Sequence, residues 1–337
     1  MLTLIVPGLM WTRQALADLT YDLPLPAFTT LLGHGRLRHL PPGSTATALA
    51  ESFGLTAPLP AAALRRLALR EDSGDSEAHD WLCLDPVRLR VEERRLVIED
   101  PRQLDLTDEE AAALAVSLAP TFADLGQLEV ISPRTWNLRL VSAAPEFQPL
   151  AEGIGRAASL LPLGTTHAAW RLAISEAQML LHAHPVNQAR EAAGKPVVNS
   201  LWPWGGGRLP TFDMKASTHD ALWGNDPVAH GIARVLRIDG VALPARFART
   251  GARSPLAVHD AMEIPARTGD ALIWRDELVR FEADWLAPAL GALRAGQLDA
   301  LRLLAPGEFA SGELHVRRHD LWKFWRKPRP LPELTPP

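Results

Sequence analysis

Apolar positions along this chain occur both as continuous runs and at helical spacing. Thr3 to Val6 form a continuous apolar run that Pro7-Gly8 closes, the pattern of a strand buried on both faces. Helical spacing follows at residues 12–19, 26–32, 46–53 and 60–70. In the carboxyl third, helices are predicted at about 226–235 and 275–295, the second kinked or divided at Pro288, and a strand at 301–304. Strands and helices that alternate in this way predict an α/β protein.

The middle of the chain has a different pattern, with several short strands around one capped helix. Thr107 to Glu110 form a capping box, and short apolar runs predict strands at 81–84, 87–91, 95–98, 128–131 and 136–141. The acidic run from Glu71 to Asp80 is typical of an exposed linker, and a long helix is predicted at about 167–193. We therefore predict a main domain from residues 1–75 and 196–327, an inserted α+β subdomain with its connecting helix at 80–195, and an extended proline-rich tail at 328–337.

Composition limits the possible partners and the compartment. A net charge of −4 over 337 residues gives no overall attraction to nucleic acid or to an anionic membrane. Cys83 is the single cysteine, which excludes an intramolecular disulfide and fits a reducing cytoplasm. The apolar amino end is too short to span a bilayer and lacks a basic leader. The sequence therefore predicts a cytoplasmic protein without a membrane partner.

Cationic, amide and glycine residues are concentrated between positions 184 and 208. An apolar run at 197–204 has polar residues before it and glycines and an arginine after it: Asn187, Arg190, Lys195, Gly205, Gly206, Gly207 and Arg208. Glycine lets backbone N–H groups approach a ligand, and a guanidinium group suits phosphate or carboxylate. The segment predicts an anion site at the carboxyl end of a strand. The alternative is a tight strand-exit turn between two packed tryptophans.

Two separate segments resemble one enzyme family. Residues 184–208 are similar to the His-Pro-Val-Asn signature of the archaeal-type cofactor-independent phosphoglycerate mutases, and Pro42-Gly43-Ser44, before a helix that ends at Phe53-Gly54, is similar to their nucleophile turn. A closer overall pattern, including the ending Leu321-Trp-Lys-Phe-Trp-Arg326, is that of the bacterial RpfE-type regulatory protein family. The resemblance implies an alkaline-phosphatase-like core, with a mostly parallel sheet flanked by helices and an inserted small α+β subdomain.

In active relatives, the resemblance implies, a serine at the Ser44 position attacks a phosphoryl group that two divalent metals clamp. The alternative for Ser44 is a plain helix cap, which the local sequence favours. Several expected metal ligands are missing, because Pro7 stands where the family has aspartate and Thr45 replaces the aspartate after the nucleophile. A serine without a base or a metal is a poor nucleophile. We therefore predict no cofactor, and a divalent metal only if the chain is an active enzyme.

Basic and aromatic residues alternate near the carboxyl end. Trp322, Phe324 and Trp325 stand among Arg317, Arg318, Lys323, Arg326, Lys327 and Arg329. Such a segment can bind an anionic partner, but the slightly acidic chain argues against nucleic acid. The favoured interpretation is a segment folded onto the core, with its tryptophans buried and its cations solvated.

Three functions remain open from the sequence. The first is a non-catalytic regulatory protein that binds a small phosphorylated or carboxylated metabolite through the residues named between 187 and 208, with Ser44 lining a vestigial site. The second is an active metal-dependent phosphomutase or phosphatase with Ser44 as nucleophile. The third is a scaffold that docks a protein partner through Trp322, Trp325 and Arg326.

Overall fold

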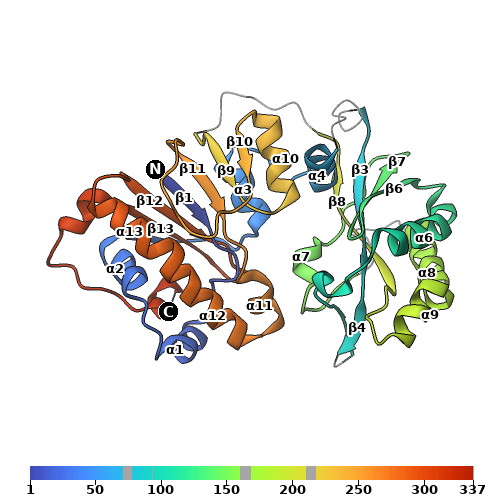
Figure 1. Cartoon of the computed structure of the whole chain (residues 1–337), viewed down its shortest axis with the longest axis horizontal. Coiled ribbons are helices and arrows are strands. Elements are labelled where there is room, and N and C mark those ends of the chain that lie inside the picture. The colour runs from blue at the N-terminus through green and yellow to red at the C-terminus, as the bar shows by residue number, and fades with distance from the viewer. Residues whose placement is uncertain (71–77, 93, 160–167, 210–217, 337) are drawn as a thin grey trace. The chain divides into compact units, whose positions relative to one another are not determined.

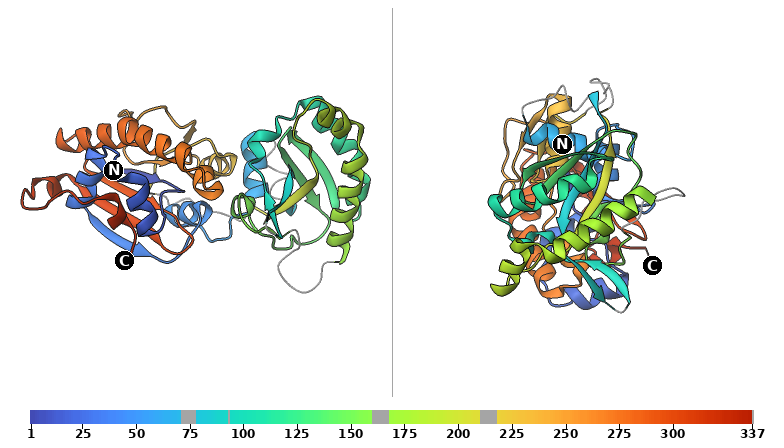
Figure 2. Two further views of the ribbon diagram at one scale, coloured as in Figure 1. Left: turned by 90° about the horizontal axis from the view of Figure 1, so that it is seen from below. Right: turned by 90° about the vertical axis from the view of Figure 1, so that its right-hand side faces the viewer.

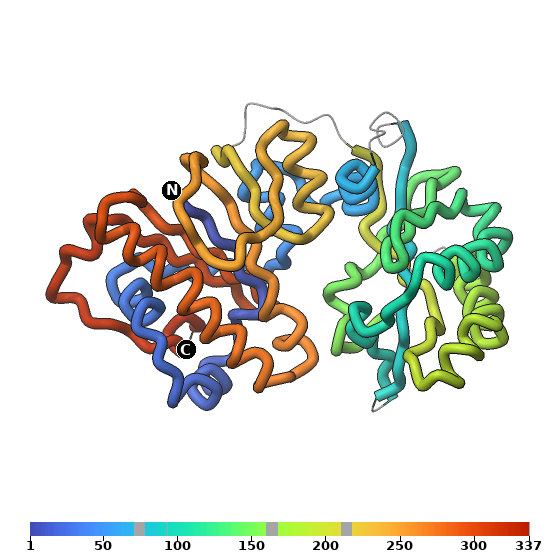
Figure 3. Tube along the Cα trace, in the orientation of Figure 1, coloured from blue at the N-terminus to red at the C-terminus, as the bar shows by residue number. Residues whose placement is uncertain are grey.

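The chain folds into two compact units, which we describe separately. The structure is a computed structural model that describes residues 1–70, 78–92, 94–159, 168–209 and 218–336. Unit 1 comprises residues 1–58 and 212–337, and unit 2 comprises residues 59–211. Unit 1 thus brings together segments from both ends of the sequence, and unit 2 is built from its middle (Figure 3). Most of the predicted linker, residues 71–77, lies outside the described residues.

A seven-stranded sheet forms the centre of unit 1, in the order β10-β9-β11-β1-β12-β13-β2. Neighbours from β10 to β12 are parallel, and β13 is antiparallel to both β12 and β2. It follows that β2 runs in the same direction as the five parallel strands. The strands are β1 (Leu2–Ile5), β2 (Arg36–Leu40), β9 (Ala221–Trp223), β10 (Asp239–Val241), β11 (Pro255–Val258), β12 (Ala300–Ala305) and β13 (Ser311–Arg317). The predicted fold class is confirmed: a large, mostly parallel sheet flanked by helices.

Helices cover both faces of this sheet (Figures 1 and 2). One face carries α1 (Arg13–Thr20), α2 (Pro26–His34), α12 (Ala271–Phe281) and α13 (Ala287–Arg294), which share a core with Leu2 and Leu4 of β1. The other face carries α3 (Thr45–Ser52) and α10 (Pro227–Leu236), and the short α11 (Glu263–Thr268) follows β11. Among the described residues, no helix has the length and apolar character needed to cross a bilayer.

Pro288 affects the predicted long helix as expected. The helix is divided into α12 and α13 by a π-helical turn at Glu282–Leu286, directly before the first turn of α13, in which Pro288 lies. Because proline lacks an N–H, the regular hydrogen-bond pattern cannot continue through it unchanged. Glu282, within the turn, accepts hydrogen bonds from the backbone N–H groups of Ala27 (2.6 Å) and Phe28 (2.9 Å) at the start of α2. The irregular turn therefore also caps a neighbouring helix.

Unit 2 is built on an antiparallel sheet in the order β6-β7-β3-β8. One face packs against α6 (Asp108–Leu118) and α8 (Ala168–Ala183), and the other against α4 (Ala61–Leu69). The strands are β3 (Trp81–Val87), β6 (Gly126–Ser132), β7 (Thr135–Leu140) and β8 (Ser200–Gly207), with a separate hairpin of β4 (Leu89–Glu92) and β5 (Arg95–Ile98). The helices are α6 (Asp108–Leu118), α7 (Leu150–Gly153), α8 (Ala168–Ala183) and α9 (Pro185–Ala192). The predicted capping box at Thr107 and Glu110 is present, and Pro185 splits the predicted long helix into α8 and α9.

The boundaries between the units differ from those predicted. Residues 59–70 and 196–211 belong to unit 2 and not to the main domain. The reason is pairing: β8 lies along β3, and α4 packs on both strands. The last residues are not an extended tail either, because Leu331–Leu334 form a 3-10 turn whose two leucines are buried in the core of unit 1.

Candidate functional site

The carboxyl ends of the parallel strands of unit 1 form the first candidate site. In sheets of this kind, ligands bind at the edge where the strands end. Because β2 runs in the same direction as β1, β9, β11 and β12, all five end at this edge. The residues that follow these strands are Ser44, Pro7-Gly8, Asn225-Asp226, His259-Asp260 and Gly307-Glu308.

Ser44 is a helix cap in this structure. Its hydroxyl oxygen accepts a hydrogen bond from the backbone N–H of Thr47 at 3.2 Å and lies 3.0 Å from the Thr47 hydroxyl. The preceding turn is fixed by a bond from the Gly43 N–H to the Gly307 carbonyl at 3.0 Å. No histidine or carboxylate among the described residues hydrogen-bonds the hydroxyl. Ser44 therefore has the geometry of a helix cap, at the position directly before α3.

The end of β1 is closely packed. The φ angle of Gly8 is +81°, and a Cβ atom there would lie 2.3 Å from the carbonyl oxygen of Met262. The Gly8 carbonyl accepts hydrogen bonds from the indole N–H groups of Trp274 (2.7 Å) and Trp11 (3.2 Å). The chain after β11 therefore packs directly on the backbone next to Pro7, the position at which the sequence resemblance implies a metal ligand.

Carboxylates dominate the charge of this edge. Arg267 pairs with Glu263 at 3.3 Å and with Glu308 at 3.9 Å. Burial raises the pKa of Glu263, the charge of Arg267 lowers it, and the nearby Asp260 and Asp226 raise it further. In residues 1–336, apart from the masked gaps, no group of three or more His, Cys, Asp or Glu side chains is placed to hold a metal ion. This donor set does not fit the two metals implied by the sequence resemblance, and its charge disfavours an anion.

His259, buried at the end of β11, gives this unit a predicted acid sensitivity. Burial beside Phe281 and Trp285 lowers the pKa of His259 from its ordinary value of 6.5, while Asp260 has a smaller raising effect. The unfolded chain therefore binds this proton more readily than the folded one. The stability that neutral His259 provides is complete above about pH 6.5 and is lost as the pH falls below that value.

The test compares the wild type with His259→Phe, which keeps an aromatic ring and does not titrate. We expect the melting temperature of the wild type to fall more than that of the variant between about pH 7.5 and about pH 5.5. His219, whose pKa is also lowered by burial, is present in both proteins, so its contribution to the acid sensitivity cancels in the comparison. Equal acid sensitivity of the two proteins would contradict the assignment.

In the predicted anion segment, Asn187 and Arg190 have structural partners. The Asn187 amide donates to the carbonyls of Leu181 (2.7 Å) and Val198 (2.6 Å) and accepts from the Val198 N–H at 3.0 Å. The Arg190 guanidinium, whose side chain is 1% exposed, donates to three backbone carbonyls and to the Glu110 carboxylate at 2.6 Å. Both side chains tie α9 to the rest of unit 2.

The other predicted ligand residues are spread along β8 and its surroundings. A Cβ on Gly205, Gly206 or Gly207 would lie 2.7, 2.6 or 3.2 Å from the Cβ atoms of Ala61, Ala144 or Pro60, so these glycines let neighbouring chain segments pack closely on the strand. Lys195 is exposed, and Arg208 pairs with Asp80 at 3.2 Å. The structure does not bring this set together around one space, and binding of an anion by it remains a prediction.

A buried polar network in unit 2 was not predicted. Arg65 on α4 forms two hydrogen bonds with Asp85 on β3, at 2.7 and 2.8 Å, and both side chains are buried. Asp85 also accepts from the backbone N–H of Trp136 (3.1 Å) and the indole N–H of Trp204 (2.7 Å). No spacing in the sequence links these residues.

In unit 1, by contrast, the apolar run before His259-Asp260 was a sequence signal from which β11 could have been predicted.

Comparison with known proteins gives a likeness of fold. No protein-family model and no curated protein matches the sequence. The solved structure of the PH0037 protein from Pyrococcus horikoshii is similar, with 14% identity, a TM-score of 0.53, and coverage of 94% of this chain and 87% of that one. A cofactor-independent phosphoglycerate mutase from Thermoplasma acidophilum DSM 1728 is 17% identical over 94% of this chain and 89% of that one, with a TM-score of 0.46. At these identities the first likeness concerns the fold alone, and the second TM-score is too low to support a conclusion.

Proposed function

We propose that this chain is a phosphomutase-like protein that binds a small phosphorylated or carboxylated metabolite and does not transfer a phosphoryl group from Ser44. The observation that carries the proposal is the state of the Ser44 hydroxyl, which caps α3 and is bonded to Thr47. A nucleophilic serine needs a base or a metal at hydrogen-bonding or coordinating distance. The closely packed end of β1 and the carboxylates around Arg267 fit a protein that has lost the transfer step. A regulatory role of the RpfE type remains part of the proposal.

The test separates capping from catalysis. Ser44→Ala removes both the nucleophile and the cap, and we expect it to cost about 1 kcal/mol of stability. Ser44→Asn removes only the nucleophile, because asparagine is also a good capping residue, and we expect it to keep the stability of the wild type. With 3-phosphoglycerate or p-nitrophenyl phosphate and Mg²⁺, Mn²⁺ or Zn²⁺, all three proteins should show only background hydrolysis and mutase activity. Metal-dependent turnover of the wild type that both variants lose would establish the active-enzyme alternative instead.

A second candidate function, docking of an acidic protein partner, is supported by the exposure of the aromatic segment at residues 322–325. Trp322, Phe324 and Trp325 are 75%, 89% and 66% exposed, which corrects the expectation that the tryptophans would be buried. The backbone is nevertheless held in place: Arg326 donates to the His34 carbonyl at 2.7 Å, and the Arg329 N–H donates to Thr29 at 3.0 Å. Aromatic side chains and arginines are frequent anchors of protein interfaces.

The local charge favours an acidic partner. Residues 317–329 contain six basic residues and one acidic residue in a chain whose net charge is −4. The expected result is a partner recovered from cells by the wild type at low salt and lost when Trp322, Phe324 and Trp325 are all replaced by alanine. Phe309→Ala is the control, because Phe309 is 85% exposed and lies outside the segment. Equal loss of the partner in the control, or none in the triple variant, would count against this candidate.

A further inference from the structure

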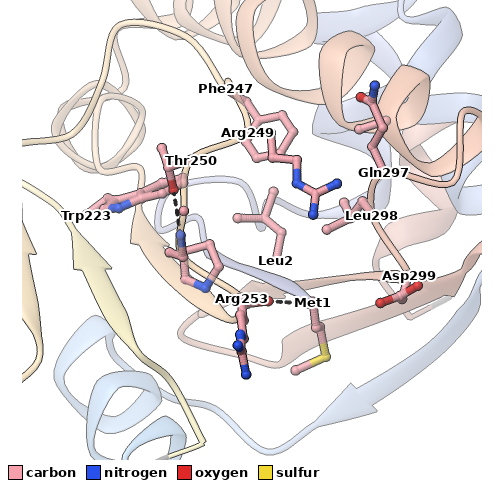
Figure 4. Close-up of a pocket in the computed structure, with 14 residues that line it drawn as sticks. Met1, Leu2, Trp223, Phe247, Arg249, Thr250, Arg253, Gln297, Leu298 and Asp299 are labelled. Atoms are coloured by element: carbon pink, nitrogen blue, oxygen red, sulfur yellow. Dashed lines mark hydrogen bonds between the residues drawn. The ribbon is translucent and has the colours of Figure 1, made fainter.

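A cavity of about 270 Å³ lies at the opposite edge of the unit 1 sheet, where β1, β11 and β12 begin. Its walls come from the start of β1, the loop at residues 247–255 and the turn after α13, residues 297–299 (Figure 4). The volume is slightly below the range of about 300–1,000 Å³ common for drug-sized ligands. The space suits a small metabolite and not a nucleotide.

The Met1 amino group lines the cavity and donates to the Arg253 carbonyl at 2.8 Å, and the other cationic groups there are two arginine side chains. Arg249 and Arg253 line it, and in the part of the chain that the structure describes neither guanidinium has an ion pair or a hydrogen bond. Figure 4 shows the Arg249 guanidinium directed into the space near Leu2 and Leu298. A guanidinium without an acidic partner is well suited to bind phosphate or carboxylate with two parallel hydrogen bonds.

The rest of the lining constrains the ligand further. Leu2 and Phe247 are buried, and together with Leu298 they give the cavity an apolar wall beside Arg249. Gln297 and Asp299 also line it, and they bring an amide and a carboxylate. A carboxylate attracts hydroxyl or amine donors and repels a second anion. The fitting ligand is therefore a short carbon skeleton with an anionic group at one end and a hydroxyl or amine at the other.

We infer that this cavity is the anion-binding site of the protein, with Arg249 as the main contact to the phosphate or carboxylate of the metabolite. The inference rests on the proposed binding function and assigns it a place. It also accounts for the charge distribution, because the carboxyl edge collects Asp226, Asp260, Glu263 and Glu308 around one arginine, whereas the cavity offers two unpaired arginines beside one carboxylate. The ligand site would then lie away from the position of the vestigial nucleophile.

Isothermal titration calorimetry at low salt tests the assignment with glycerol 3-phosphate, glycerate, inorganic phosphate and glycerol as probes. We expect glycerol 3-phosphate or glycerate to bind the wild type, and Arg249→Ala to weaken that binding by about tenfold or more, since a charge-assisted contact is lost. Arg294→Ala is the matched control: Arg294 is exposed on the nearby α13 and does not line the cavity, so its loss should leave the affinity unchanged. Arg249 is exposed, so its variant should melt at the temperature of the wild type.

The possible results distinguish the cavity from the function. Equal affinity of the wild type and Arg249→Ala for an anionic probe would overturn the cavity assignment and leave the binding function standing. If none of the anionic probes binds the wild type, the proposed function itself fails. Binding of inorganic phosphate alone, with no gain from a carbon skeleton, would contradict the role of the apolar wall. Binding of glycerate as tight as that of glycerol 3-phosphate would identify a carboxylate as a group that the site also recognises.

Discussion

Replacement of Asp85 by alanine is expected to destabilise unit 2 by about 3–5 kcal/mol, the usual cost of removing one partner of a buried ion pair. The Asp85 carboxylate accepts four hydrogen bonds, two of them from Arg65. Without it, the buried Arg65 guanidinium would lose two charge-assisted hydrogen bonds, and the N–H groups of Trp136 and Trp204 would lose their acceptor. An unmatched buried charge costs far more than the net gain from a surface pair.

The measurement is equilibrium unfolding in urea, followed by circular dichroism. Arg208→Ala is the matched control, because Arg208 also pairs with an aspartate, Asp80 at 3.2 Å, but its side chain is 54% exposed. We expect the control to lose less than about 1 kcal/mol. The double variant Arg65→Ala, Asp85→Ala should cost less than the sum of the two single changes, since the two side chains interact directly and each single change already removes that interaction. A loss in Asp85→Ala as small as that in the control would show that the network does not stabilise the unit.

Replacement of Arg190 by alanine should have the next largest effect, about 2–4 kcal/mol, and should act on stability and not on anion binding. Its guanidinium bonds to the carbonyls of Leu104, Asp105 and Pro196 as well as to Glu110. Each buried acceptor left without a donor costs about 1–3 kcal/mol, although Glu110 is partly exposed and can be solvated. The contacts join α9 to the segment before α6, so their loss should loosen this side of unit 2.

Two comparisons make the Arg190 result decisive. Arg190→Lys keeps the positive charge but loses the planar set of donors, and we expect it to recover only part of the lost stability. Titration of the folded Arg190→Lys protein with glycerol 3-phosphate should give the affinity of the wild type, because the cavity in unit 1 is untouched. A variant that melts like the wild type but no longer binds the probe would instead restore the sequence-based prediction of an anion site between residues 187 and 208.

The limits of the sequence are clearest for the short strands of unit 1. β9 and β10 have three residues each, too few for a period to be recognised. β11 has four, and its one sequence signal is a short apolar run. Their partners are remote in sequence, since Thr3 of β1 lies opposite Leu256 of β11. The partner of β8 is also remote in sequence, although the apolar run of β8 itself was correctly predicted as a strand. Its assignment to the wrong domain followed from the absence of any local feature that specifies β3 as its neighbour.

Candidate site residues were harder to predict than elements because their role depends on what surrounds them. Arg190 and the glycines at 205–207 have the composition of an anion site, yet the structure surrounds them with carbonyls and with close-packed Cβ atoms. No local pattern distinguishes Arg249 and Arg253 from the other arginines, because nothing in the neighbouring sequence shows that a guanidinium will be left without a partner. The exposure of Trp322 and Trp325 could not be predicted from the local sequence either, since apolar residues are buried only where another element covers them.

The sequence alone determined the α/β class, the buried first strand, the capped helix after Thr107 and the break near Pro288, because backbone geometry and local hydrogen bonds decide these features within a few residues. Only the tertiary structure decided which strands are neighbours, which arginines are paired and which remain available, and what fills the space at the end of β1. Those outcomes depend on contacts between residues that can lie more than 250 positions apart, and they are fixed by packing and charge pairing in the assembled units.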